Sequence, residues 1–459
     1  MIDENFTRIA KLHQSITSHQ SAIWSGSLSE PIRPFKLSII TQYYPPDYAA
    51  TGQLIEELAT HLGDRGLEIH IFTGQPGYAF GQKSAPTREC LDNLNIRRTR
   101  TAQFVPQRIR GKALNGLFFF LRSALHLLKT AGRGDVLLLT TAPPFLPVLG
   151  YFVHLCFGIP YVCLLYDLYP DVAIELNVIE KTHWMVKFWN ALNARIWQKA
   201  QAIIVLSSSM KQRVEAKCPE VSDKISVIHS WANPNHILPI PKEQNWFAHR
   251  HNLADKFSVL YSGNMGRCHD LETIMETAVQ LQHEPIQFVF IGSGAKRQVC
   301  LDLVEEKGLK NCLFLPYQDK QLLPYSLTSC DLSLVSISPG MEGLVAPSKL
   351  YGILAAGRPV AAICEPHSYL RQLIADANCG ASFNNGDSTE LANFIRRLAY
   401  DHQLTQLLGN SGRHYLLSHF TPEIIAQEYL QVLSYSVQSH KVHQRLRDRT
   451  QKSPNYFLG

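Results

Sequence analysis

Hydrophobic and polar positions alternate along this chain in a repeating order that begins at Lys36. A short apolar run, typical of a buried strand, is followed by a turn and then by a segment whose apolar residues recur at helical spacing. In the first unit, an expected strand at 37–43 precedes an expected helix at 53–65, which ends at Gly66. Alternation of this kind predicts parallel sheets covered by helices.

Two series of these units are separated by a segment rich in turn residues, at 231–256. The first series continues through expected strands at 67–73, 135–141, 160–166 and 201–206 and closes near 225–228. The second has expected strands at 257–262, 286–291, 331–336 and 359–363, a helix capped by Asp270, and helical patterns after Asp387 and over 422–433. We therefore expect a loosely ordered extension at 1–35, two domains at 36–235 and 236–420, a C-terminal helix at 421–439, and a basic, frayed tail at 440–459.

The composition is that of a folded globular protein and restricts its partners. A net charge of +6 over 459 residues is small for a nucleic-acid binder, so we expect no nucleic-acid partner. The 10 cysteines contain no CxxC pair and no metal-ligand spacing, which favours reduced thiols in a cytoplasmic protein. The first 35 residues lack the pattern of a signal peptide, and the apolar stretches 113–128 and 142–165 are interrupted by charged residues or prolines, so we expect no membrane-spanning helix.

Two loops at the carboxyl ends of strands in the first half are candidate binding sites, because ligands of open α/β sheets bind outside those ends. The loop 43–52 ends in Thr51 and Gly52, whose amides we expect to be free at a helix start and to approach an anion or a sugar. The alternative is an ordinary tight turn. The loop 166–171 carries Asp167, which we favour as a carboxylate that positions hydroxyls or assists proton transfer. Asp171 has an equal alternative role as a helix cap.

A third loop, 262–270, follows the first strand of the second half. Its Gly263 and Gly266 allow a close approach of the backbone to a ligand, and Arg267 can offer paired donors to a phosphate. The alternative is an arginine that is merely solvated.

A fourth segment, 342–351, begins with Glu342, which could accept hydrogen bonds from sugar hydroxyls. Pro347 suits a first helical turn, which would aim the amides of Ser348 and Lys349 outward at a diphosphate. The alternative is an ordinary helix start with a surface lysine.

In this order, the four segments resemble family 4 glycosyltransferases of the GT-B fold, in particular the bacterial branch that builds colanic acid, capsules and O-antigens. The resemblance covers roughly Lys36 to Leu433 and rests on the segments QYYPPD…TG, YDLYPD, SGNMGR and VAPSKLYGILAAGRPV. It implies two Rossmann-like, doubly wound parallel-sheet domains that face each other across a cleft. The first would bind the acceptor and the second the nucleotide-sugar donor.

The resemblance also implies a retaining, metal-independent transfer of the hexosyltransferase type, usually from a UDP-sugar and without a cofactor. Arg267 and Lys349 match the cations that stabilise the leaving diphosphate, and Glu342 matches the residue that contacts the donor sugar. The other candidate donor contacts are Gly52, Gly263, Asn264, Gly266, Gly292, Gly294, Ser348 and Leu350. Two positions depart from the family pattern: Gly352 replaces a second Glu that contacts ribose, and His269 replaces a more usual Lys.

The acceptor is expected, again from the resemblance, to be a glycan or a lipid-linked sugar. The segment 108–129 mixes apolar and basic residues and could rest on the inner face of the plasma membrane as a peripheral contact; the alternative is a helix packed on the sheet. We expect Glu342 to supply the lost ribose contact, because Gly343 would allow it to turn inward, with Glu365 as the other candidate. Two other functions remain open: a nucleotide-sugar epimerase of the same fold, and a non-catalytic scaffold that binds nucleotide sugars.

Overall fold

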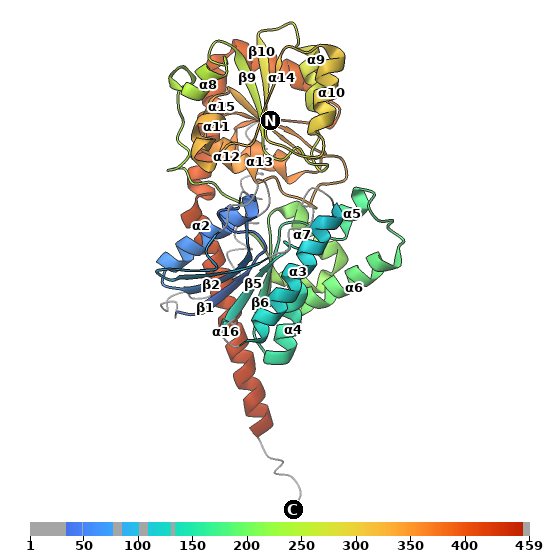
Figure 1. Ribbon diagram of the computed structural model, residues 1–459, viewed down its shortest axis with the longest axis vertical. Helices are drawn as coiled ribbons and strands as arrows, with labels where there is room; N and C mark the ends of the chain where they lie inside the picture. The colour runs from blue at the N-terminus through green and yellow to red at the C-terminus, as the bar shows by residue number, and fades with distance from the viewer. Residues whose placement is uncertain (1–33, 48, 77–84, 101–108, 130–133, 453–459) are drawn as a thin grey trace, which may run out of the picture. The chain divides into compact units, whose positions relative to one another are not determined.

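The computed structural model describes residues 34–47, 49–76, 85–100, 109–129 and 134–452 (Figure 1). Within these residues the chain forms two sheets, one on each side of the predicted linker. The first sheet has eight strands in the order β3-β4-β2-β1-β5-β6-β7-β8. Its strands are β1 (Lys36–Ile40), β2 (Glu68–Gly74), β3 (Arg88–Leu91), β4 (Leu94–Thr99), β5 (Val136–Thr140), β6 (Tyr161–Leu165), β7 (Ala202–Val205) and β8 (Ile225–Val227).

Helices connect these strands, as the alternating pattern predicts. They are α2 (Ala50–Asp64), α3 (Ile109–Leu128), α4 (Pro147–Phe157), α5 (Asp171–Glu175), α6 (Trp184–Lys199) and α7 (Ser208–Lys217). All strand pairs are parallel except β3 with β4. That antiparallel hairpin was not predicted, because its outer strand β3 is short, polar and largely exposed.

The second sheet has six parallel strands in the order β11-β10-β9-β12-β13-β14. Its strands are β9 (Phe257–Ser262), β10 (Ile286–Ile291), β11 (Cys312–Leu315), β12 (Leu332–Ser336), β13 (Val360–Ile363) and β14 (Gly380–Phe383). The helices of this half are α8 (Trp246–Arg250), α9 (Glu272–Gln280), α10 (Arg297–Lys307), α11 (Leu323–Thr328), α12 (Lys349–Ala355), α13 (Tyr369–Ala377), α14 (Ser388–Tyr400) and α15 (His402–His419). The doubly wound α/β prediction is therefore confirmed in both halves.

The central strands are buried along their whole length and mostly apolar, because helices cover both faces of each parallel sheet. Every residue of β5, β6 and β7 is buried, and so is every residue of β10 and β12. In the second half, the inner faces of α9 and α14 close a core around Phe288 and Phe290. These two rigid sheets fix where the loops at their carboxyl ends begin.

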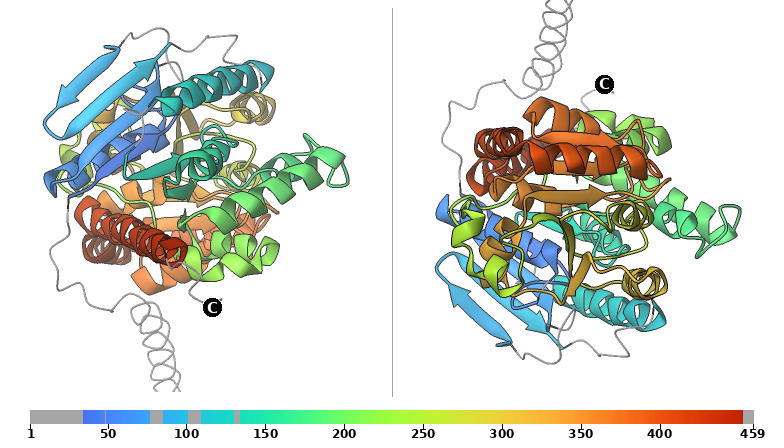
Figure 2. Two further views of the ribbon diagram at one scale, coloured as in Figure 1. Left: turned by 90° about the horizontal axis from the view of Figure 1, so that it is seen from below. Right: turned by 90° about the horizontal axis from the view of Figure 1, so that it is seen from above.

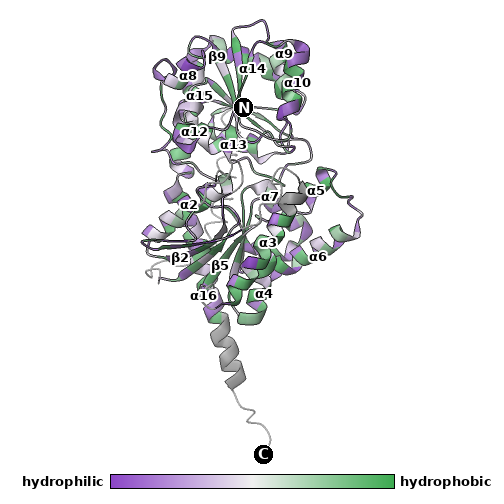
Figure 3. Cartoon of the chain, in the orientation of Figure 1, coloured by the Kyte–Doolittle hydropathy of each residue, from purple (hydrophilic) through white to green (hydrophobic). Residues whose placement is uncertain are grey.

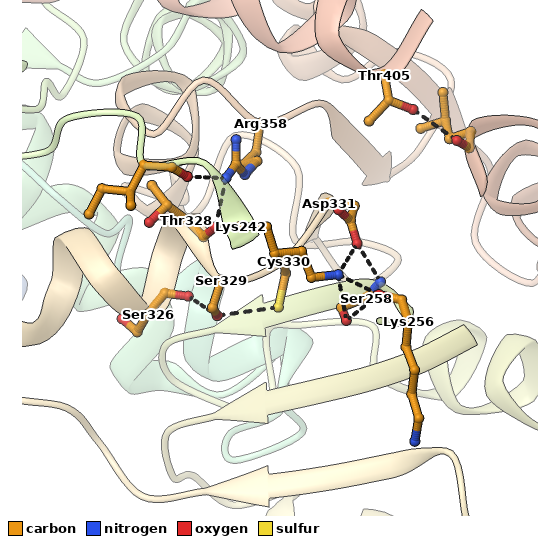
Figure 4. A network of polar contacts seen from close by, with 12 residues as sticks. Lys242, Lys256, Ser258, Ser326, Thr328, Ser329, Cys330, Asp331, Arg358 and Thr405 are labelled. Atoms are coloured by element: carbon orange, nitrogen blue, oxygen red, sulfur yellow. Dashed lines mark hydrogen bonds and ion pairs between the residues drawn. The ribbon is translucent and has the colours of Figure 1, made fainter. Parts of the chain in front are cut away.

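A partly buried ion pair fastens the linker to the second sheet (Figure 4). Lys242 Nζ lies 2.6 Å from Asp331 Oδ2 and also donates to Ser258 Oγ at 3.3 Å. The same Asp331 oxygen accepts from the Ser258 amide at 2.7 Å. These contacts lie at the amino ends of β9 and β12, the opposite end from the predicted site, and we assign them a structural role.

The last helix, α16 (Pro422–Lys452), returns to the first half and packs on α2, β5 and β6 (Figure 1). From the sequence, this helix is expected to end at residue 439 and to be followed by a frayed tail. That expectation is wrong for residues 440–452, which continue the helix. The tail contains helix-favouring Lys, Arg and Gln and lacks Gly or Pro before residue 454, so helix propagation has no local stop.

All 10 cysteines are free thiols, and 6 of them are buried. None of the described helices is long and apolar enough to cross a membrane.

Candidate active site

Loops with glycines in the left-handed or extended region line the carboxyl ends of β9 and β10. Gly263 follows β9 and Gly292 follows β10, with φ values of 130° and 134°. A Cβ on Gly292 would lie 2.1 Å from the Gly263 carbonyl oxygen, so no larger residue fits there. Hydrogen bonds from the Met265 amide to the Ser293 carbonyl (2.8 Å) and from the Lys296 amide to the Met265 carbonyl (2.9 Å) hold the two loops together. The predicted glycines therefore build one surface.

Asn264, Gly266 and Gly294 belong to the same pair of loops. Asn264 is exposed, and a Cβ on Gly294 would meet its side-chain oxygen at 2.7 Å. The Asn264 carbonyl accepts from Tyr261 Oη at 2.9 Å, which anchors the loop to β9.

Lys349 lies directly beneath this surface. Its Nζ is 3.6 Å from the centroid of the Tyr261 ring, and a Cβ on Gly263 would stand 3.3 Å from its Cε. The Nζ atom is buried and has no hydrogen-bond partner among the described residues. Burial lowers the pKa of Lys349 to about 7, because charge is disfavoured away from water. Lys349 is therefore not the surface lysine of an ordinary helix start, which was the alternative interpretation of the sequence.

His269 is the second titratable group of this cluster. Its Nδ1 lies 2.8 Å from the Ser336 carbonyl oxygen, so Nδ1 carries the proton and donates. Burial, followed by the charge of Lys349, lowers the pKa of His269 to about 3. Where the family has a further cation, this chain therefore has a neutral imidazole.

Arg267 extends into solvent from the same loop. Its side chain makes no ion pair or hydrogen bond within the part of the chain that the structure describes, while its carbonyl accepts from Ser338 Oγ at 3.4 Å. Arg267 is thus free to meet a ligand over the glycine surface. Among the described residues, neither Arg267 nor Lys349 has a carboxylate partner that would have to be displaced.

The helix α12 begins two residues later than predicted, at Lys349, with Ser348 as its N-cap. Pro347 lies before the helix, and the Leu350 amide donates to its carbonyl at 3.5 Å. The Leu350 side chain is fully buried, so only its backbone could contact a donor, and this contact stays a prediction.

Glu342 is almost entirely buried, at 1% exposure. One oxygen, Oε1, accepts from the Tyr369 amide at the start of α13 at 3.3 Å, a position that the helix dipole favours. The other oxygen, Oε2, is buried and has no described partner. Glu342 Oε2 is therefore an acceptor that no described residue uses.

Gly343 has a different role from the predicted one. Its φ is 72°, and a Cβ there would lie 2.7 Å from the Ser209 carbonyl oxygen and 2.9 Å from Arg213 Cγ. It allows close packing against α7 of the first half rather than an inward turn of Glu342. Arg213 completes this contact by donating to the carbonyls of Glu342 (3.1 Å) and Gly340 (3.4 Å).

The two halves also meet at the loop that carries Asp167. Val345 forms β-bridges with both Asp167 and Glu342, and the Leu168 amide donates to the Leu344 carbonyl at 3.1 Å. The structure thus brings the backbones of two acidic residues, which lie 175 positions apart in the sequence, to the same strand residue, Val345. The sequence did not point to Arg213 and Val345, since nothing in their local pattern shows that they lie at this junction. It also did not point to Tyr261, whose ring lies under the Lys349 ammonium group within the second half.

Burial raises the pKa of Asp167 to about 6. Its backbone amide donates to Thr141 Oγ1, and a small cavity beside it is lined by Phe145 and Trp189. Cys268 of the arginine loop is close enough to interact with this carboxylate: burial, then the charge of Asp167, raises the pKa of the Cys268 thiol to about 11. Asp167 thus lies at the junction with the second half.

Two further candidates are placed differently from the prediction. The Gly52 amide donates to the Ala49 carbonyl at 2.9 Å and is not free, which corrects its role as an anion donor. A Cβ on Gly52 would lie 3.0 Å from the carbonyl carbon of Tyr43 and from the amide nitrogen of Tyr44, so the helix start packs closely on this backbone. At Gly352, a Cβ would point toward the apolar Leu327 (3.4 Å) and Ile237 (4.0 Å). Glu365 is already engaged, accepting from the Gly340 amide at 3.1 Å.

Comparison with known proteins identifies the family to which the chain belongs. The model of Glycosyltransferase Family 4 matches residues 51–236, and that of Glycosyl transferases group 1 matches residues 242–415. The chain belongs to the family 4 glycosyltransferases. Over 294 residues it is 28% identical to the glycosyltransferase WbjE of Pseudomonas aeruginosa, covering 63% of this chain and 72% of WbjE.

A second relative and a solved structure extend the comparison. The colanic acid biosynthesis glycosyl transferase WcaI of Escherichia coli strain K12 is 36% identical over 119 residues, which are 26% of this chain and 29% of WcaI. The structure of Anabaena HepE in complex with UDP and glucose superposes with a TM-score of 0.65 at 15% identity, over 87% of this chain and 99% of that one. The fold of this family 4 enzyme is GT-B, as the resemblance implied.

Proposed function

We propose that this glycosyltransferase transfers a sugar, with retention of configuration, from a UDP-sugar to a glycan or a lipid-linked acceptor in the synthesis of a bacterial polysaccharide. The observation that carries the proposal is the buried Lys349 ammonium group, which lies under the Gly263 loop without an anionic partner among the described residues. A buried cation is unfavourable until an anion neutralises it. A diphosphate bound over the two glycine loops would supply that anion.

The relatives support the class of substrate. WcaI is named for colanic acid biosynthesis, and HepE is bound to UDP and glucose in its structure.

Each polar group of the site would have one role in the transfer. The bond between the anomeric carbon and the β-phosphate oxygen breaks, and charge develops on the departing UDP. Lys349 and Arg267 would stabilise that charge. The free oxygen of Glu342 would accept a hydrogen bond from the donor sugar. Asp167 would orient the acceptor hydroxyl, whose oxygen forms the new bond to the anomeric carbon while its proton passes to the departing diphosphate oxygen.

We further propose that no metal takes part, because the two cations would perform its electrostatic role. Among the described residues, no group of three His, Cys, Asp or Glu side chains is placed to hold a metal ion. The test is activity in excess EDTA, described in the Discussion.

A donor panel tests the proposed function. Purified protein is incubated with individual UDP-sugars, and UDP release, epimerised sugar and bound nucleotide are measured separately. Release of UDP that accelerates with a glycan acceptor is the expected result. Epimerisation without release would indicate an epimerase, and binding without turnover would indicate a scaffold.

A further inference from the structure

A small cavity lies beside Asp167, at the carboxyl ends of β5 and β6, and the transfer described above does not use it. Its volume is about 20 Å³, and residues of α4 and α6 close it from the outside. The lower view of the molecule in Figure 2 shows α4 (teal) beside α6 (green), and Figure 3 shows α4 as largely hydrophobic. Because a single water-sized sphere needs about 10–15 Å³, the cavity has room for one small group.

The walls of this cavity are mainly aromatic and aliphatic. They include Phe145 and Val148 at the start of α4, Tyr169 of the Asp167 loop, and Trp189 and Trp197 of α6. Among the described residues that line it, none is Lys, Arg or His, and Asp167 is the one acidic residue. A phosphate would therefore meet a carboxylate and no cation, whereas a small apolar group would meet hydrophobic rings.

The walls are fixed before any ligand arrives. The Trp189 ring stacks on the Tyr169 ring with centroids 6.1 Å apart, and Asn193 Nδ2 donates to the Tyr169 carbonyl at 2.7 Å. On the other side, the Phe145 ring meets the edge of Phe120 from α3 at 5.4 Å between centroids. Close packing of this kind resists collapse, so the shape of the cavity can select a ligand by size.

The helix α3, which supplies Phe120, belongs to the segment 108–129. Phe119 on this helix is fully buried and stacks on Phe72 of β2, so α3 packs on the sheet, as the alternative interpretation of the sequence required. Residue 108 and the side chains of 109–113 lie outside the described residues. A peripheral membrane contact of this segment stays a prediction.

Polar atoms without partners lie next to the apolar walls. The Asp167 carboxylate, the Trp189 indole N–H and the Tyr169 hydroxyl make no hydrogen bond or ion pair within the described part of the chain. Burial raises the pKa of Asp167 to about 6, which still leaves its carboxyl mostly ionised at neutral pH and able to accept a hydrogen bond. Ligand pockets typically combine such apolar walls with a few polar groups that fix orientation.

We propose that this cavity receives a methyl group of the acceptor sugar, while Asp167 accepts a hydrogen bond from a hydroxyl of the same sugar. The methyl group would be that of a 6-deoxyhexose or that of an acetamido substituent. This inference rests on the proposed function and narrows it by naming the class of acceptor. A lipid chain is too large for about 20 Å³, and the hydroxymethyl group of an ordinary hexose adds an oxygen for which the cavity has no room.

Saturation-transfer difference NMR on the full-length protein, with UDP present, tests the proposal. The probes are methyl glycosides in three matched pairs: L-fucose with L-galactose, L-rhamnose with L-mannose, and N-acetylglucosamine with glucose. In at least one pair, the C6 or acetamido methyl should receive more saturation than the glycosidic O-methyl, which serves as an internal reference. That glycoside should bind at least about fourfold more tightly than its counterpart, the value of burying one methyl group. The first two pairs report a 6-deoxy methyl, and the third reports an acetamido methyl.

Two variants change the size of the cavity in opposite directions. Val148→Leu adds a methylene to the wall and should abolish the methyl preference by filling the space. The matched control is Val299→Leu on α10, the same exchange at a side chain that is 65% exposed, and it should keep the preference. Trp189→Phe has a smaller ring, so it should admit the hydroxymethyl counterpart and bring the two affinities close together. Circular dichroism and thermal unfolding establish that each variant is folded.

Equal binding of both members in all three pairs by the parent would overturn the proposal. So would a methyl preference that both Val148→Leu and Trp189→Phe retain, because the methyl group would then lie elsewhere. These measurements need no sugar transfer. A donor panel without UDP release would therefore refute the proposed function, while loss of the methyl preference alone would refute only the assignment of this cavity.

Discussion

The affinity of this glycosyltransferase for UDP should fall steeply as pH rises through neutrality, because Lys349 is the buried cation of the site. In the free protein its Nζ is buried over the Tyr261 ring without an anionic partner among the described residues, and burial lowers its pKa to about 7. A bound diphosphate would hold the ammonium form and raise that pKa. UDP therefore binds preferentially to protein that carries a protonated Lys349.

The magnitude follows from the fraction of Lys349 that is protonated. With a pKa of about 7, this fraction falls roughly 25-fold between about pH 6.5 and about pH 8.5. The dissociation constant for UDP should rise by the same factor, which corresponds to about 1.9 kcal/mol of binding free energy. Binding above neutrality should take up about one proton per UDP.

Titration calorimetry in two buffers of different ionisation enthalpy measures both the affinity and the proton uptake. The control is Lys349→Met, which keeps an apolar chain of similar length. At about pH 6.5 it should bind UDP roughly 10- to 150-fold more weakly than the parent, the value of a hydrogen bond to a charged group. The ionisation of UDP itself is common to both proteins, so only the difference between them reports Lys349.

The stability of the two proteins gives an independent check. The pKa of Lys349 is lower in the folded protein than the ordinary 10.5, so the unfolded chain binds more protons between about pH 7 and about pH 10.5. The parent should therefore gain stability relative to Lys349→Met as pH rises across that range. A parent whose UDP affinity is independent of pH, or a Met variant with the same pH dependence, would refute the placement of Lys349 at the diphosphate.

Four further predictions concern the rest of the site. Arg267→Ala should reduce kcat by about 100-fold or more without unfolding the protein, because it removes one preorganised electrostatic group. Near-normal steady-state rates would show that Arg267 is not part of the active site. Activity should persist in excess EDTA; complete loss that Mn²⁺ restores would show that a metal performs the role given to the two cations. Glu342→Gln should weaken UDP binding by about 1.5–3 kcal/mol if this carboxylate replaces the ribose contact missing at Gly352, and unchanged binding in calorimetry would leave Glu342 as a sugar contact at most. Arg213→Ala should lower kcat about tenfold with little change in UDP affinity, because Arg213 holds the backbone beside Glu342. Partial recovery of kcat in Arg213→Lys would support this positioning role. An equal loss of UDP affinity would contradict it.

The sequence by itself determined the class of fold and the donor-side loops. Strands such as β5 and β10 are almost entirely apolar, because both faces of a parallel sheet are covered, and this pattern is visible without a structure. The role of Gly263 and Gly292 could also be predicted from the sequence, since a close approach of two loops leaves no room for a side chain. Lys349 and Arg267 follow from their place relative to these glycines and from the resemblance.

Only the tertiary structure decided how the two halves meet. Contacts between Val345 and Asp167, and between Arg213 and the Glu342 backbone, join residues more than 100 positions apart, and no local pattern records them. The error at Gly52 has a local cause, because its amide donates to the Ala49 carbonyl three residues earlier. The burial of the Leu350 side chain, by contrast, is decided by tertiary packing. Burial also sets the charge state of Lys349, because the pKa of a lysine depends on the water and charges around it rather than on its neighbours in sequence.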